Sequence, residues 1–441
     1  MSMVVKNNMS AINTLNVLNV NTQNLSKNLA KVSSGMKING AADDASGYAI
    51  SERMRVQIRS LDQDKANTQN GSSLMKVAEG AVSSTVDILK TLKEKVINAA
   101  NDTNTDSDRA TIQKELDQSI DQINDNANVT FNGKYLVDGS HNNKVTQTTC
   151  TMTNQSLDKN ATWDTHFTEL KNRDGNALCI TETDTVTVSF VNMGRTYTTS
   201  FEVGSTQLRD IISNANAEWT AKGMAGDALV QKEATSFIGL DASTNSVYTA
   251  SGENGLTLAA GSSGVNGQIG GITISITDNT GKVNKSANAV LDDFTEMIRA
   301  QNESADNAIV LQIGTKASQS IKAGMTDMRA VALGLQGTDG ATLSVGTQQK
   351  ANAAINVLDA AIQKALDQQT TIGSIQSRLE YTASNLTTAS ENVQSAESVV
   401  RDADMAKEMT EYTKNNVLMQ AAQSMLAQAN QNSSNVLSLL Q

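Results

Sequence analysis

Two histidines are the first candidates for acid–base or metal chemistry in this sequence, His141 and His166. A zinc enzyme of the commonest helical type needs the spacing H-E-x-x-H, because the two imidazoles must share one helix face. Neither histidine lies in that pattern, and His166 has only Glu169 three residues on. We therefore interpret both as ordinary surface or core residues and expect no metal and no cofactor.

Two cysteines are the next candidates, Cys150 and Cys179, and they do not form a C-x-x-C motif. Outside the cell they could form a disulfide, which would stabilise a loop of this size by roughly 3–4 kcal/mol. Two free, buried thiols fit the sequence equally well. The pair Asp43–Asp44 fits a helix cap better than acid–base work. No phosphate-binding loop, nucleophile elbow or dinucleotide fingerprint occurs, so we predict that the protein is not an enzyme.

The composition points to long helices and away from nucleic acid. Among 441 residues, only 3% are aromatic, 18% are charged and none is proline, so nothing in the composition favours a large aromatic core or helix kinks. The formal net charge of -11 argues against nucleic acid, which requires a basic surface. The sequence has no run of 18 apolar residues and no cleavable signal at its start, so we expect no membrane partner and a route of export without signal cleavage.

Both ends of the sequence carry apolar residues that alternate by three and four positions, which is the seam of a coiled coil. We predict that the extreme ends use these seams as contacts between copies of the chain. The predicted self-assembly seam residues are Leu15, Leu18, Leu25, Leu29, Val32, Met405, Met409, Met419, Leu426, Leu437 and Leu440. Similar seams at 78–99 and 355–393 fit an ordinary intramolecular core.

The helical pattern predicts separate elements in both outer parts of the chain. The expected helices are 9–32, 48–69, one beginning near Leu74 and ending near Ala99, one around 112–123, 348–400 and a final helix from Met405. Asn132–Gly133 predicts a hairpin within 129–137. Helical pattern also returns near Ala287 and is expected to be firm from Ala317, with a glycine-rich interruption at 334–346.

The middle of the chain has a different pattern. It contains both histidines, both cysteines, both tryptophans and many glycines between about 140 and 286. Alternating residues predict strands at 185–190, 196–203, 256–260 and 271–277, and a short helix at 207–217. The fold class is therefore mainly α: a long antiparallel helical rod or coiled coil formed by both chain ends, with an inserted α+β central domain.

Several stretches resemble bacterial flagellins in the order that the family has them. They are LSKNLAKVSSGMKINGAADDASGYAI from Leu25, VTFNG from Val129, DMRAVALGL from Asp327 and the tail MLAQANQNSSNVLSLLQ. The resemblance implies five parts. They are an N-terminal inner-core segment at 1–40, half of the helical rod with its hairpin at 41–139, a surface-exposed insert at 140–299, the other half of the rod at 300–400 and a C-terminal inner-core segment at 401–441.

The resemblance implies a structural subunit that polymerises into the extracellular flagellar filament for motility, with terminal helices that fold on assembly. Its partners would be further copies of itself, an export chaperone, and cap and hook-junction proteins. The alternatives are a minor junction-type flagellin on the same fold and, as a different class of protein, a secreted flagellin-like immune ligand or adhesin.

Flagellins recognised by Toll-like receptor 5 present an arginine, a leucine and a nearby glutamate. The matching positions in this sequence are Thr91, Lys95 and Glu115, so only the glutamate is kept. We therefore expect weak or altered signalling through that receptor.

Overall fold

The structure is a computed structural model that describes residues 7–439, with side chains described for residues 7–435. It divides into two compact units. The terminal unit consists of Met1–Thr68, Gln312–Gln319 and Tyr381–Gln441, and the central unit consists of Gln69–Leu311 and Ser320–Glu380. The long helices of the chain are α1 (Met9–Ser34), α2 (Ala45–Ala99), α3 (Asp106–Ala127), α6 (Gln348–Arg401) and α7 (Met405–Leu439).

Local capping sets the ends of the first helices. The Asn8 side chain accepts a hydrogen bond from the Ala11 amide at the start of α1, and Gly35 ends the helix with φ of 70°. The carboxylate of Asp44 accepts hydrogen bonds from the amides of Ser46 and Gly47, each at 3.0 Å, directly before the first turn of α2. Asp44 therefore caps α2 as predicted, whereas the carboxylate of Asp43 accepts from the amides of Asn39 and Gly40 in the preceding turn.

Helix α2 is continuous, so the predicted break between 69 and 74 is wrong. Gly71 lies inside the helix, where a Cβ atom would come within 2.7 Å of Cδ1 of Leu311. The glycine thus allows Leu311 to approach the backbone of α2 closely. A glycine inside a helical pattern cannot by itself be distinguished from a helix end.

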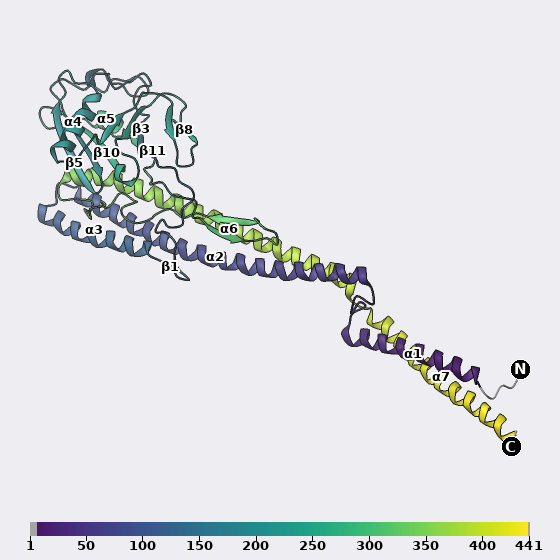
Figure 1. Ribbon diagram of the computed structural model, residues 1–441. Helices are drawn as coiled ribbons and strands as arrows, with labels where there is room; N and C mark the ends of the chain where they lie inside the picture. Colours follow the sequence, from purple (N-terminus) through teal and green to yellow (C-terminus); the bar gives the residue numbers. More distant parts are fainter. Residues whose placement is uncertain (1–6, 440–441) are drawn as a thin grey trace. The chain divides into compact units, whose positions relative to one another are not determined.

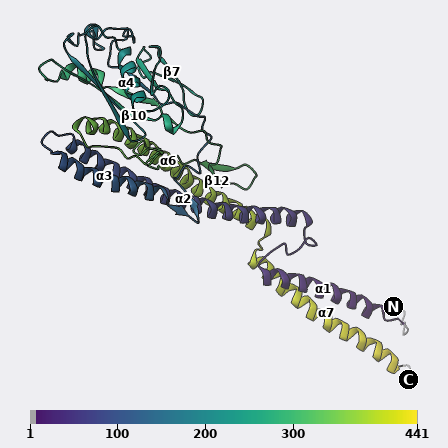
Figure 2. The same ribbon diagram turned by 60° about the vertical axis from the view of Figure 1, so that its left-hand side comes forward.

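Helices α2 and α6 run antiparallel in the central unit, and α3 lies beside α2 there (Figures 1 and 2). Lys93 of α2 forms an ion pair with Asp359 of α6, and Gln376 of α6 donates to Glu79 of α2 at 2.7 Å. The higher-numbered residue of α2 contacts the lower-numbered residue of α6, so the two helices run antiparallel. After α3, strands β1 (Thr130–Phe131) and β2 (Lys134–Tyr135) form the predicted hairpin around Asn132–Gly133, both with positive φ.

The central insert contains two principal sheets with a shared apolar core. One sheet has the order β10-β4-β5 and the other β11-β3-β9-β6, and all described pairings in them are antiparallel. The strands are β3 (Thr151–Asn154), β4 (Thr185–Asn192), β5 (Arg195–Glu202), β6 (Leu229–Gln231), β9 (Leu256–Ala260), β10 (Ile269–Thr277) and β11 (Phe294–Ile298). All four predicted strands are confirmed, and α4 (Arg209–Ala221) confirms the short helix.

Smaller elements complete the insert. They are η1 (Phe167–Glu169), the hairpin β7 (Phe237–Leu240) and β8 (Ser246–Tyr248), η2 (Val265–Gly267) and α5 (Lys285–Leu291). Within the core, the ring of Phe190 stacks on that of Tyr197 at 5.1 Å, and the Tyr197 ring lies 4.9 Å from that of Trp219. Most of the few aromatic residues of the chain thus lie in the insert.

The helix expected from Ala317 is wrong. The chain there forms β12 (Ile309–Gln312), β13 (Ser320–Ala323) and an irregular segment, and helix resumes only at Gln348. Neighbouring helices satisfy the backbone of the irregular segment: Asn124 accepts from the Ala330 amide at 2.9 Å, and Lys364 donates to the Ala332 carbonyl at 2.6 Å. Its apolar side chains are buried at the same time, so the helix-like spacing reflects packing and not helical backbone.

Asp292, directly after α5, is an acid that the insert largely encloses. Burial raises the pKa of its carboxyl to about 7. The hydrogen bond that the carboxylate accepts from the Ile274 amide at 3.3 Å acts to lower this pKa, and the negative charge of the neighbouring Asp293 acts to raise it. In the unfolded chain the same group loses its proton near pH 4. The folded insert therefore holds this proton over a range of pH in which the unfolded chain has lost it.

We expect the stability of the insert to be full below about pH 4, to fall as the pH rises from 4 to 7, and to stay low above 7, because ionisation of buried Asp292 costs free energy. Asp292→Asn keeps the acceptor and should remove this loss, which is at most about 4 kcal/mol. Urea unfolding followed by the fluorescence of Trp163 and Trp219, both in the insert core, measures it. Equal stability of variant and parent at pH 8 would contradict the prediction.

Candidate assembly surface

Helices α1 and α7 form an antiparallel pair in the terminal unit (Figures 1 and 2). The amide of the Asn8 side chain donates to the carbonyl of Ala429 at 3.1 Å, and at the other end Lys31 lies 3.7 Å from Glu408. These contacts hold the two ends of the chain side by side. The pair is a two-helix structure, so only one stripe on each helix faces the partner.

That geometry divides the predicted α1 seam into two sets. Leu18, Leu25 and Val32 are half-buried, whereas Leu15 and Leu29 remain 45% and 52% exposed. The half-buried set of α1 is completed by small or polar residues, namely Asn8, Ala11, Thr14, Asn21, Asn28 and Lys31. Sequence reasoning placed all five seam residues on one face, but pairing with a single partner selects only part of them.

Helix α7 shows the same division. Met419 and Leu426 are half-buried, while Met405 and Met409 are exposed. The side chain of Leu437 lies outside the described side chains, and Leu440 lies outside the described residues. The predicted seam of the last helix is therefore also shared between a paired face and an open face.

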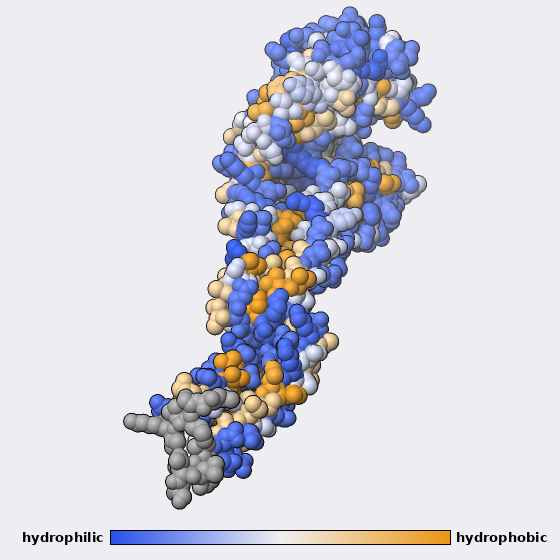
Figure 3. Space-filling view, turned by 90° about the vertical axis from the view of Figure 1, so that its right-hand side faces the viewer, coloured by the Kyte–Doolittle hydropathy of each residue, from blue (hydrophilic) through white to orange (hydrophobic). Residues whose placement is uncertain are grey.

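Helix α1, which is described in full, contains no buried residue. Apolar side chains on both terminal helices stay exposed, and Figure 3 shows orange apolar groups between blue polar ones at this end of the molecule. The exposed apolar residues of the two helices are Met9, Ile12, Leu15, Val17, Val20, Leu29, Met405, Met409, Val417, Leu418 and Met425. Exposed apolar side chains that recur along two paired helices are typical of an interaction site.

Arg401, the last residue of α6, joins that helix end to α2 and to the loop before α2, and sequence reasoning missed it. Its guanidinium donates from Nη1 to Oε1 of Glu52 at 2.7 Å and lies 5.7 Å from the Tyr48 ring centroid. Its carbonyl accepts from the Lys37 amide at 2.7 Å. The hydrogen bond from Arg401 is the main reason that the pKa of Glu52 lies below its usual value. No motif marks this residue in the sequence, since its partners are about 350 positions away.

The residues whose side chains could take part in catalysis or metal binding do not gather into one site. His141 is half-exposed and contacts the Asn307 carbonyl at 3.2 Å, while His166 lies near the Gln207 side chain. Within the described part of the chain, no group of three or more histidine, cysteine or acidic residues could hold a metal ion.

The two cysteines are both free, and no disulfide joins them. Cys150 is buried, and burial with the nearby Glu296 raises the pKa of its thiol, whereas Cys179 is exposed. Of the two alternatives, the thiols are free, but only one of them is buried.

Comparison with known proteins decides the family. A model of the bacterial flagellin N-terminal helical region matches residues 5–142, and a model of the C-terminal helical region matches residues 355–440. The flagellin of Clostridium tyrobutyricum is 35% identical over 97% of this chain and 99% of its own length, and the flagellin of Bacillus subtilis (strain 168) is 32% identical over 99% and 100%. The chain belongs to the bacterial flagellin family.

This flagellin is therefore a structural subunit of the flagellar filament, and it is exported to form that filament outside the cell. These findings confirm the family, the fold class, the function and the location expected from the sequence. None of the helices described for this flagellin has the length and hydropathy needed to cross a bilayer. Among solved structures, the flagellar hook associated protein-3 of Legionella pneumophila aligns with 78% of this chain and 97% of its own at 15% identity, with a TM-score of 0.33 that carries no argument.

The three positions that the sequence aligns with the receptor epitope of the family lie on α2 and α3 in the central unit. Thr91 is exposed, and its hydroxyl donates to the Asp87 carbonyl at 3.0 Å. Lys95 is half-buried and forms an ion pair with Glu115 at 3.0 Å. The glutamate that matches the family pattern is thus already engaged by a lysine of the same chain.

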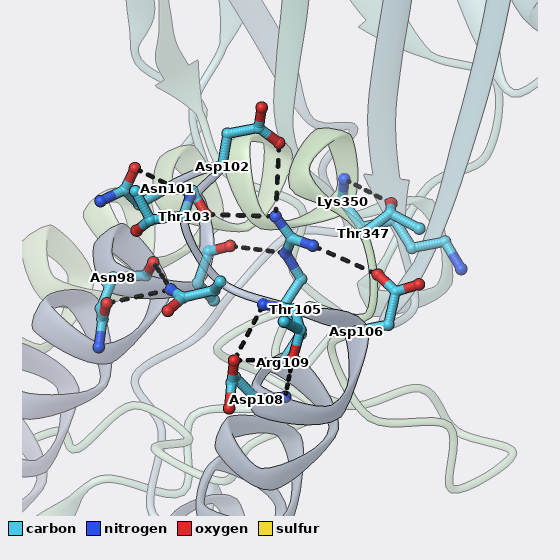
Figure 4. Close-up of polar contacts among 12 residues, drawn as sticks. Asn98, Asn101, Asp102, Thr103, Thr105, Asp106, Asp108, Arg109, Thr347 and Lys350 are labelled. Carbon is cyan, nitrogen blue, oxygen red and sulfur yellow. Dashed lines mark hydrogen bonds and ion pairs between the residues drawn. The ribbon is translucent and has the colours of Figure 1, made fainter.

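A buried arginine holds the turn between these two helices (Figure 4). Arg109 donates from Nε to the Ala99 carbonyl at 3.0 Å and from Nη2 to the Asn101 carbonyl at 3.2 Å, and it pairs with Asp106 at 3.3 Å. The Ala99 carbonyl is among those that the end of α2 leaves without a helical partner, and Asn101 lies in the turn that follows. Arg109 therefore fixes the angle at which α3 leaves α2.

We expect Arg109→Ala in this flagellin to lower the free energy of unfolding by about 1–3 kcal/mol, because it leaves the carbonyl of buried Ala99 without its side-chain donor. Urea denaturation followed by circular dichroism measures the loss. Lys114→Ala, at an exposed position of α3, is the control and should change stability by less than about 0.5 kcal/mol. Equal effects of the two variants would contradict the role of Arg109.

Proposed function

We propose that the exposed apolar faces of α1 and α7 are the contacts by which copies of this flagellin polymerise, and that the two helices become stable only when neighbouring copies cover those faces. The observation that carries the proposal is the absence of any buried residue along the 26 residues of α1. Isolated helices are marginal in water, and packing of an apolar face supplies most helical stability.

The predicted seam residues fit this proposal in two roles. Leu18, Leu25, Val32, Met419 and Leu426 support the α1–α7 pair, since they are half-buried in the single chain. The remaining set, Leu15, Leu29, Met405 and Met409, is exposed and free to contact other copies. Leu437 and Leu440 are proposed for the same contacts on the sequence pattern alone.

The same proposal extends to the division of the chain. The segments 1–40 and 401–441 supply the inner core of the filament, 41–139 and 300–400 the helical rod, and 140–299 the outward-facing insert. The concentration of aromatic core in the insert supports an independent outer body. As partners we propose the export chaperone, the cap and the hook-junction proteins that the family resemblance implies.

We expect Leu29→Ser to raise the critical concentration for polymerisation by about tenfold or more, because it removes a leucine that assembly buries. The thermal midpoint of the single chain should not change. Asn24→Ser, another exposed position of α1, is the control and should leave both quantities unchanged. Seeded polymerisation followed by light scattering measures the difference. A critical concentration equal to that of the control would refute the assignment of the open face.

For Toll-like receptor 5 we propose weak recognition of this flagellin. Thr91 lacks the charge and the donors of an arginine, and the Lys95–Glu115 pair would have to be broken in an apolar contact. We expect the double variant Thr91→Arg, Lys95→Leu to activate receptor-bearing cells at least about tenfold more strongly than the parent. Lys90→Arg, a conservative change at an exposed neighbour, is the control. Activation by the parent at nanomolar concentration would contradict weak recognition.

A further inference from the structure

One buried acid in the terminal unit has no evident task in the single chain. Asp64 of α2 is only 5% exposed, and its Oδ2 atom has no hydrogen-bond partner. It lies between buried Leu61 and buried Thr68 on one stripe of the helix, where a coiled coil normally places apolar residues. A carboxylate in this place costs stability unless a cation or a donor compensates it.

Asp64 also lines an open groove. The chain from Gln312 to Ala317 crosses α2 and is held by Asn67, whose side-chain amide donates to the Gln312 carbonyl at 3.4 Å. The groove between them has a volume of about 610 Å³, which is sufficient for a long side chain. Val56, at 61% exposure, lies on its edge and adds an apolar contact.

Two basic side chains line the groove, but neither pairs with Asp64. Arg59 and Lys316 both line it, but both are exposed and neither forms an ion pair with the buried carboxylate. Burial is the sole cause that raises the pKa of Asp64, with no opposing charge to lower it. The carboxylate is thus uncompensated by the described residues of its own chain.

We propose that this groove is a docking site between copies of the chain, in which a lysine or arginine side chain of a neighbouring copy pairs with Asp64. Charge complementarity is the argument: the groove offers a buried anion, and a long basic side chain provides both the cation and the apolar stem to fill the space. The inference rests on the proposed polymerisation, which brings a neighbouring copy to each subunit at high local concentration. A free metal ion fits poorly, since no cluster of ligands exists among the described residues.

The test compares two single changes on the same helix. Asp64→Asn removes the buried charge and keeps the shape, while Asp62→Asn removes an exposed charge whose carboxylate accepts from the Ser390 hydroxyl at 3.2 Å. We expect Asp64→Asn to raise the critical concentration for seeded polymerisation by about tenfold or more, the effect of losing one hydrogen bond to a charged group. Its monomer should melt at the same or a higher temperature. Asp62→Asn should stay within about twofold of the parent.

Two outcomes overturn the inference. Polymerisation of Asp64→Asn equal to that of Asp62→Asn means that no partner uses the carboxylate. A lower melting temperature of the Asp64→Asn monomer, with a matching loss of polymerisation, means that the carboxylate serves only the fold of its own chain. In both outcomes the parent protein still polymerises. If the parent and the Asp62→Asn control both failed to polymerise, that result would count against the proposed function instead.

Discussion

The burial of narrow apolar stripes on long helices is the constraint on which this structure depends. In the central unit α2 has α6 and α3 as neighbours, and residues such as Val82, Leu89 and Val96 are fully buried there. In the terminal unit α1 has α7 as its helical neighbour and buries nothing completely. The same kind of sequence pattern thus gives a closed core where three helices meet and an open surface where two do. That difference links the fold to polymerisation.

Polar side chains set the places where the long helices begin, end and pair. Arg109 supplies a donor to the last carbonyl of α2. Arg401, at the end of α6, donates to Glu52 of α2, and its carbonyl accepts from the Lys37 amide in the loop before α2. Both arginines are buried, and each contacts several partners at the end of a long helix. A chain with few aromatic residues outside its insert depends on such contacts to fix the angles between its helices.

The insert is organised on a different principle. Its two sheets enclose an apolar core that contains both tryptophans and the buried thiol of Cys150, and its ionisable groups are either exposed or held by that core. The histidines, cysteines and acids that could have carried chemistry are dispersed among the described residues of this body. This dispersal fits a structural protein, and the assembly contacts that we propose lie on the helical ends of the chain.

The sequence by itself determined the order of the elements, because periodicity reports which residues share a face: the strands of the insert, the hairpin at Asn132–Gly133 and the extent of α6 follow from it. It could not show that Gly71 lies inside a helix, that the segment after Ala317 is irregular, or that the seam of α1 divides between Leu18 and Leu29. Those results depend on neighbours that are distant in the sequence, such as Leu311, Asn124 and α7. Tertiary structure decided them for a physical reason. An apolar stripe on a helix shows that the stripe must be covered, but only the packed chain determines which elements cover it and on how many sides of the helix they lie.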